Sequence, residues 1–329
     1  MPSRLWAYLA LALASATPAC SSPKARASGR IVVAVTVDWE GAAFSPDSLD
    51  ALDELRKRIA PAPLTHFVSA AYFTKDHPDA RAAKYIAEAV HPGDELALHL
   101  HAWRSLARAS GIEPKLSPSF VTGTDKLYEF EDGDIGFDTD LDVYGVTELR
   151  ALIRKSAQLR EQTHVPVAKT FRSGGYLGTP KVLEALRLEG FTVDSSATDY
   201  RQIDQKQDSF LSRRVREVWP VVDTASQPYF VDPRRQLLEM PIAATADYVT
   251  AADVVQLVEA ARAKLESDPH RDVFVVLGCN QETAQDFAMR IGEAIQQLRG
   301  RAAIADHLLL TTVDKAAAMA RNQTAPPTS

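Results

Sequence analysis

The sequence predicts an α/β fold built on parallel strands. Apolar stretches typical of strands alternate with amphipathic stretches typical of helices through most of the chain. The first strand, 31–37, is a run of apolar or β-branched residues, as expected for a strand buried on both faces. It ends at Asp38 and Glu40, whose side chains would leave an extended chain on the same side. Because active sites of such folds lie at the carboxyl ends of strands, these acids mark a candidate site, although a helix cap or a solvated strand end is an alternative.

The later elements are expected from their own patterns of apolar and turn residues. Apolar residues at helical spacing, with Pro46 in the first turn, predict the first helix at 45–59. We expect further helices at 80–90, 147–162, 181–189, 251–265, 282–298 and 313–320. We expect further strands at 64–73, 93–103, 169–176, 191–196, 236–242, 273–278 and 308–312.

The composition is that of a globular protein with a large core. The chain has 329 residues, of which 46% are hydrophobic and 24% charged, enough for one large α/β domain or two small ones. The net charge is −6 and no basic stripe is present, which argues against a nucleic-acid partner.

The first twenty residues have the character of a signal peptide. Arg4 provides the positive region, residues 5–14 an apolar region too short to span a bilayer, and small residues precede Cys20. The segment resembles a bacterial lipoprotein signal. That resemblance implies an acylated Cys20 and an exported protein anchored by lipid in the cell envelope, on the periplasmic or outer-membrane face. A plain secretory signal cleaved near Ala19 or a little later is the alternative.

The rest of the chain is predicted to contain a single folded domain between two unstructured segments. Residues 21–30, which are small and polar, predict a flexible tether, and residues 321–329 predict a disordered tail. The domain between them, 31–320, contains one cysteine, Cys279, so acylation of Cys20 leaves no intramolecular disulfide.

His99 and His101 lie two residues apart in an apolar strand, which places both imidazoles on one face. A buried histidine is commonly a hydrogen-bonded core residue. Two on one face indicate a divalent metal more strongly, because the ion provides a partner for both rings. Two imidazoles and one carboxylate make a ligand set found in hydrolytic metal sites, and Asp38 or Glu40 could supply the carboxylate.

Two loops are further candidates for function. The acidic segment 129–142 lies in a long stretch without clear periodicity, and a functional loop, a calcium site and a solvated acidic face all remain open. The strand at 169–176 runs into adjacent glycines that let backbone N–H groups approach a ligand, and Arg172 brings a planar cation to the same strand end.

The order of these segments resembles that of the polysaccharide deacetylases of carbohydrate esterase family 4. Thr-Val-Asp-Trp-Glu-Gly at 36–41 is similar to the family motif Thr-Phe-Asp-Asp-Gly, with a tryptophan between the acids. Residues 95–101 are similar to its second motif, with histidines two rather than four apart. Phe-Arg-Ser-Gly-Gly-Tyr at 171–176 resembles the third, Arg-x-Pro-x-Gly, and 190–196 resembles the strand that follows.

The resemblance implies a distorted (β/α) barrel and a metal-dependent deacetylase, a hydrolase of carbon–nitrogen bonds. Its substrate would be N-acetyl or O-acetyl groups on a cell-envelope or extracellular polysaccharide. It implies that Glu40, His99 and His101 bind a divalent metal, with zinc expected.

The same resemblance assigns roles around the metal. Asp38 is implied as the general base and Arg172 as the residue that orients it. The backbone N–H groups of Gly175 and Tyr176 are implied at the oxyanion, and Trp103 at the substrate.

The sequence departs from the family pattern at Asn280. Family members carry the general acid, a histidine, at the position with which Leu-Gly-Cys-Asn at 277–280 aligns. Asparagine cannot serve as a general acid. His66 and His307 are other candidate acids. A catalytically impaired, envelope-anchored glycan-binding protein and a hydrolase of a non-glycan amide or ester are therefore alternatives.

Overall fold

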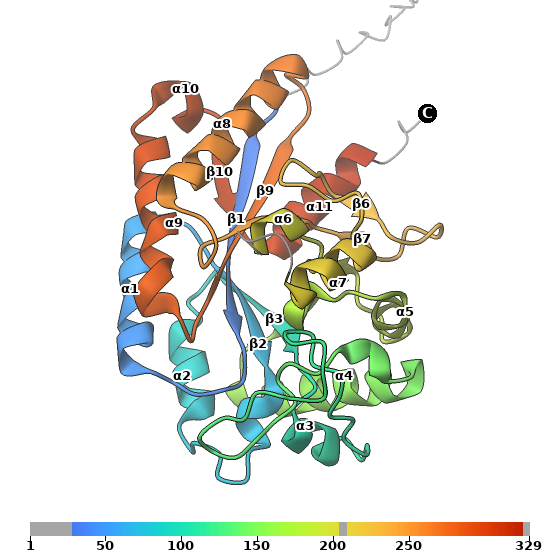
Figure 1. Ribbon diagram of the computed structural model, residues 1–329. Helices are drawn as coiled ribbons and strands as arrows, with labels where there is room; N and C mark the ends of the chain where they lie inside the picture. The colour runs from blue at the N-terminus through green and yellow to red at the C-terminus, as the bar shows by residue number, and fades with distance from the viewer. Residues whose placement is uncertain (1–27, 204–208, 325–329) are drawn as a thin grey trace, which may run out of the picture.

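The computed structural model describes residues 28–203 and 209–324. The predicted signal peptide with Cys20, and the predicted tether up to residue 27, lie outside the described residues. The described part of the chain forms a single curled sheet surrounded by helices (Figure 1).

Ten strands build this sheet within the described residues, in the order β6-β7-β5-β4-β3-β2-β1-β9-β8, with β10 also paired to β1. Every pairing is parallel except β6 with β7. The strands are β1 (Ile31–Trp39), β2 (Thr65–Ser69), β3 (Glu95–Leu100), β4 (Val167–Ser173), β5 (Val193–Asp194), β6 (Tyr229–Phe230), β7 (Leu238–Glu239), β8 (Ile242–Thr245), β9 (Val273–Asn280) and β10 (Leu308–Thr311).

Helices follow most of the strands and cover the outside of the sheet (Figure 1). The α-helices are α1 (Pro46–Ile59), α2 (Ala82–Ala89), α3 (Arg104–Ala109), α4 (Val146–Arg160), α5 (Pro180–Leu188), α6 (Tyr200–Ile203), α7 (Phe210–Val218), α8 (Ala251–Ser267), α9 (Ala284–Arg299), α10 (Ala302–Ala305) and α11 (Val313–Thr324). The 3-10 turns are η1 (Ala70–Phe73), η2 (Leu141–Val143), η3 (Glu161–Thr163) and η4 (Gly174–Tyr176).

Strand β1 is paired with three other strands of the sheet. All nine of its residues are buried, because β9 pairs along one edge while β10 and then β2 pair along the other. A strand covered on both edges and both faces requires a continuous apolar sequence, which is what residues 31–37 provide.

The edge strand β8 approaches the segment that follows β5. Ile242, at the start of β8, makes this contact through its N–H, which donates to Ala197 O at 2.8 Å. Thr198 and Ile242 also form an isolated parallel bridge. The curled sheet is therefore a distorted (β/α) barrel, as the resemblance implied.

Helix α1 illustrates why these segments are helical. Ser45 caps it by accepting a hydrogen bond from Ser48 N, and Pro46 occupies the first turn. Leu52, Leu55 and Ile59 are buried in the hydrophobic cluster that also contains residues of β1 and α9. Burial of each such side chain stabilises the fold by about 1.5–3 kcal/mol.

Several predicted boundaries were wrong for local reasons. The strand predicted at 236–242 is two strands, β7 and β8, which Pro241 separates because proline has no N–H to donate to a ladder. The strand predicted at 64–73 ends at Ser69, whose Oγ accepts from Ala71 N and begins η1. The short elements β6, α6 and α7 were not predicted.

The ends of the described chain also differ from expectation. Gly29 N donates to Pro269 O at 2.7 Å, and Arg30 forms an ion pair with Asp272 at 2.8 Å, so these last two residues of the predicted tether pack on the domain. Helix α11 continues to Thr324, so residues 321–324 of the predicted tail are helical. No helix among the described residues has the length and apolar character needed to cross a bilayer.

Candidate metal centre

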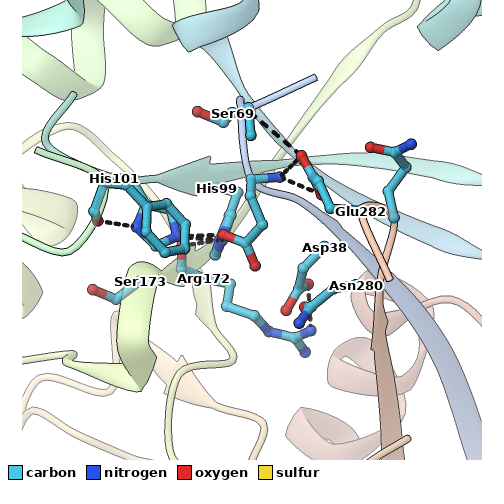
Figure 2. A network of polar contacts seen from close by, with 12 residues as sticks. Asp38, Ser69, His99, His101, Arg172, Ser173, Asn280 and Glu282 are labelled. Atoms are coloured by element: carbon cyan, nitrogen blue, oxygen red, sulfur yellow. Dashed lines mark hydrogen bonds and ion pairs between the residues drawn. The ribbon is translucent and has the colours of Figure 1, made fainter. Parts of the chain in front are cut away.

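Functional side chains gather where β1, β3, β4 and β9 end at their carboxyl termini. Asp38 lies in β1, His99 in β3, Arg172 in β4 and Asn280 in β9. Figure 2 shows these four side chains converging on one space. Parallel pairing puts the carboxyl ends at one end of the barrel, which is why residues far apart in sequence meet here.

Glu40, His99 and His101 form the core of the site. One ligand atom from each lies within 4.8 Å of the others. Glu40 Oε2 is 3.0 Å from His99 Nε2 and also contacts His101 Nε2. The two Nε2 atoms are 3.1 Å apart. The sequence predicted that both imidazoles share one face, and the structure brings them together with Glu40 rather than Asp38 as the carboxylate.

The opposite nitrogen of each imidazole is held by a main-chain carbonyl. His99 Nδ1 lies 3.0 Å from Arg172 O, and His101 Nδ1 lies 2.6 Å from Phe137 O. A carbonyl only accepts, so each Nδ1 carries a hydrogen and each ring turns its Nε2 toward Glu40.

This donor set fits a divalent metal ion. Two Nε2 lone pairs and a carboxylate oxygen face one another at close range, an arrangement that lacks a positive partner unless a proton or a cation lies among them. Imidazole nitrogen and carboxylate oxygen with outer hydrogen bonds are the ligands that zinc uses in catalytic sites.

Charge interactions within the triad are strong. Burial acts to raise the pKa of Glu40, but the two imidazoles lower it overall. Burial acts to lower the pKa of His99, but the Glu40 carboxylate raises it overall. The site thus favours an ionised Glu40, the form that binds a cation.

The imidazole of His101 is packed from both sides. Phe137 stacks on its imidazole with ring centroids 4.3 Å apart, and Gly174 lies on the other wall. A Cβ at position 174 would be 2.4 Å from His101 Cε1, so only glycine fits there. The acidic segment 129–142 therefore contributes to the site through Phe137.

Asp38 lies beside the triad and is held by Arg172. Arg172 Nη1 donates to Asp38 Oδ1 at 2.7 Å and to Thr36 Oγ1 at 2.7 Å, and Nε donates to Ser195 O. Burial raises the pKa of Asp38, because the cost of desolvating its carboxylate exceeds the stabilisation by Arg172. The expected contact between Arg172 and Asp38 is present.

Glu282 supports the main chain of Glu40. Both of its carboxylate oxygens accept from Glu40 N at 3.2 Å, and Oε1 accepts from Tyr72 Oη at 2.7 Å. Burial, together with the nearby charge of Glu40, raises the pKa of Glu282 to about 7. No sequence motif singled out this residue, which lies two positions after the end of β9.

Asn280 is hydrogen-bonded to Asp247, which no sequence motif singled out. Its Nδ2 donates to Asp247 Oδ1 at 3.1 Å, and Thr283 Oγ1 donates to the same oxygen at 2.6 Å. Burial raises the pKa of Asp247. Because the strand before Asp247 was predicted to end at residue 242, this acid was not recognised as a strand-end residue.

Gly175 and Tyr176 form the turn after β4. Gly175 has a φ of 60° and packs under Phe120, and Tyr176 has a φ of 64°. The hydroxyl of Tyr176 lies 3.3 Å from Thr245 Oγ1, and its carbonyl accepts from Trp219 Nε1 at 2.8 Å. The phenol therefore faces the interior of the barrel.

Trp103 does not lie where a substrate could reach it. The side chain is fully buried, and its Nε1 donates to Glu40 O at 2.9 Å. Lys75 Nζ lies 3.3 Å from its ring centroid. The expectation of a substrate contact is corrected: Trp103 fixes the backbone of Glu40 from behind.

Neither alternative histidine reaches the site. His66 is buried and bonded to Trp39 Nε1 at 3.2 Å and to Asp94, as a core histidine. His307 O accepts from Ile31 N at the amino end of β1, the end opposite the site.

A cavity of about 600 Å³ adjoins the centre. It begins at Ala42 and Glu282. Four aromatic side chains line it together with five acidic ones, with Phe44 stacked on Tyr72 at 4.4 Å between centroids and Tyr128 against Phe130 at 4.7 Å. Such a wall suits the faces of a ring-shaped ligand.

No protein-family model matches the sequence, and no curated protein sequence matches it. Solved structures share its fold. A protein from Mycobacterium smegmatis described as a polysaccharide deacetylase superposes with a TM-score of 0.52 at 16% identity, over 95% of this chain and 97% of that one. A second with this description, from Pseudomonas aeruginosa PAO1, gives 0.51 at 14% identity, over 90% of this chain and 92% of that one. The chain therefore has the polysaccharide deacetylase fold.

Proposed function

We propose that the protein is a metal-dependent deacetylase of a cell-envelope or extracellular polysaccharide. One observation carries this proposal. A carboxylate and two imidazoles converge with their lone pairs, while a further carboxylate, Asp38, lies beside them. Metal-assisted hydrolysis of an acetyl group uses this division between binding a cation and accepting a proton.

Glu40, His99 and His101 would hold the ion, and zinc suits these nitrogen and oxygen donors. The ion would supply Lewis-acid polarisation of the acetyl carbonyl and would acidify a water molecule.

Asp38 is the residue placed to move protons. It accepts a proton from the attacking water, and Arg172 keeps its carboxylate pointed into the site. With asparagine at position 280, Asp38 is also the group placed to return that proton to the departing nitrogen. The carbon–nitrogen bond then breaks to give acetate and an amine. Backbone N–H groups of Gly175 and Tyr176 are proposed to stabilise the negative oxygen.

The neighbouring cavity supports a carbohydrate substrate. Its aromatic rings offer apolar faces for sugar rings, and the polar groups of Glu282, Lys75 and Ser45 lie among them. The same chain is proposed to act outside the cytoplasm, which rests on the signal-peptide pattern ahead of the described residues.

The proposal is tested by measuring acetate release from N-acetylglucosamine oligomers. Chelator-treated protein should be inactive and should recover on addition of zinc. Asp38→Asn should retain the ion and lose about 10²- to 10⁴-fold in rate, because its amide cannot accept a proton. Glu40→Gln should lose the ion. Acetate release that survives complete removal of metal, or that is normal in Asp38→Asn, would rule out this mechanism.

A further inference from the structure

The amide of Asn280 has a fixed orientation. Its Nδ2 donates to Asp247 Oδ1, which also accepts from Thr283 Oγ1. A carboxylate oxygen attracts the NH₂ end of an amide and repels its carbonyl end. The pairing therefore turns the nitrogen of Asn280 toward Asp247 and the oxygen, Oδ1, the other way.

The side chain of Asn280, which carries this oxygen, lies on the same face of the sheet as the site. Asn280 pairs in register with Asp38, so the two side chains share a face, and Figure 2 shows them side by side. Gly278, two residues earlier on the same face, would place a Cβ 3.5 Å from Thr36 Oγ1 and 3.6 Å from Arg172 Nη1. Asn280 is half-buried, and its Oδ1 has no hydrogen-bond partner among the described residues.

An open acceptor at this place can take a donor from the substrate. The acetamido group carries an N–H beside its carbonyl, whereas an acetyl ester has an oxygen there that cannot donate. We propose that Asn280 Oδ1 accepts a hydrogen bond from the N–H of the acetamido group, so that the site selects N-acetyl over O-acetyl groups. The inference rests on the proposed deacetylase function and names the substrate class within it.

The bond also positions the departing nitrogen. Asn280 and Asp38 are neighbours across β1 and β9, so a nitrogen held by Asn280 lies on the side of the site where Asp38 can reach it. Asparagine thus takes a binding role at a position from which it cannot donate a proton. Asp247 is a positioning residue, because it acts through the orientation of this amide.

The test compares two oligomers that differ only at the atom attached to C2 of each sugar: tetrameric N-acetylglucosamine, and the analogue with a 2-O-acetyl group in each unit. Their kcat/KM ratio is measured for zinc-loaded wild type, Asn280→Ala, Asp247→Ala and Thr283→Val. Their Kd values are measured on the ion-stripped proteins, where no turnover occurs. Thr283→Val removes the other hydrogen bond to Asp247 and leaves the amide pairing, so it controls for disturbance of this carboxyl.

Asn280→Ala should lower the preference for the N-acetyl substrate about 5- to 100-fold, mostly through KM and Kd, with little change in Kd for the O-acetyl analogue. Asp247→Ala should lower it in the same direction although Asn280 is intact, because its amide is free to turn. Thr283→Val should keep the ratio within about twofold.

A preference unchanged in Asn280→Ala, or equal wild-type Kd values for the two oligomers, overturns the inference. Loaded wild type that cleaves neither oligomer defeats the proposed function, whereas the Kd comparison on stripped protein still tests Asn280. Normal cleavage of the N-acetyl oligomer without any dependence on Asn280 overturns the inference and leaves the proposed function standing.

Discussion

At the scale of single residues, the site contains two kinds of group. Some side chains are arranged to face a cation, and other groups hold these side chains in place. Glu40 and the two histidines present lone pairs to one point, and each is fixed by a bond on its far side. Because the holding groups are mostly main-chain atoms, they depend on fold rather than on side-chain identity.

We predict that His99→Ala and His101→Ala each abolish tight binding of zinc, because two protein ligands remain where three are needed. Metal content after dialysis should fall from about one ion per chain to nearly none. The exposed His270→Ala serves as the control and should keep its ion. Full occupancy in both ligand variants would show that the ion binds elsewhere.

At the scale of elements, the ends of β3 and β4 determine how the imidazoles of His99 and His101, the candidate ligands, are placed. Gly174, directly after β4, lies against the imidazole of His101.

The paired carboxyls of Asp194 and Glu239 lie across β5 and β7 in register, and both are fully buried.

Gly174→Ala should displace His101, since the added Cβ would be 2.4 Å from the ring. We expect a loss of about 10- to 100-fold in metal affinity, measured by competition with a chelator. Gly145→Ala is the matched control, because its Cβ would meet only Glu148 at 3.5 Å. Equal affinity in Gly174→Ala and wild type would mean that His101 is not a ligand in this position.

The Asp194 and Glu239 pair should make stability depend on pH. Burial and the neighbouring Asp194 raise the pKa of Glu239 well above its usual range, and burial raises the pKa of Asp194 to about 6. The folded protein then holds protons that the unfolded chain releases above about pH 4.3, so the free energy of unfolding falls as pH rises through about 6.

Glu239→Gln removes one of these titrations. Between about pH 5 and pH 8 the unfolding free energy of the wild type should fall. That of Glu239→Gln should fall by about 1–3 kcal/mol less over the same range, as measured by urea denaturation. The exposed Glu293→Gln should follow the wild type. A variant that loses stability as steeply as the wild type would show that Glu239 carries no extra proton in the folded state.

At the scale of the whole molecule, β1 connects the two ends of the barrel. The chain enters β1 beside Pro269 and Asp272 and leaves it at Asp38, in the site. Nine residues of strand span roughly 30 Å, so the site lies at the end of the barrel away from the predicted tether. A lipid-anchored chain would thus reach a polymer with the far end of its domain.

Cys20→Ser tests the proposed anchor. In a bacterial host, the wild type should sediment with membranes and be released by detergent, because acylation supplies the apolar chains. The variant should be recovered in the soluble periplasmic fraction. A wild type that is soluble would instead support the plain secretory signal.

Several features could be predicted from the sequence alone: the α/β class, the fully buried first strand, and strand-end residues of the site that include His99 and His101. These follow from local rules: apolar runs predict buried strands, and alternation puts His99 and His101 on one face. Parallel strands bring their carboxyl ends together, so Asp38, Glu40 and Arg172 could be predicted as neighbours before any distance was known.

Packing of the whole chain set which acid faces the histidines and what each remaining side chain contacts. Glu40 contacts both imidazoles while Arg172 holds Asp38, a division that depends on distances between strands far apart in sequence. The burial of Trp103 behind Glu40 and the pairing of Asn280 with Asp247 depend on loops whose path no local pattern encodes. The physical reason is that periodicity reports which face a residue lies on, whereas its partner is set by packing of the whole chain.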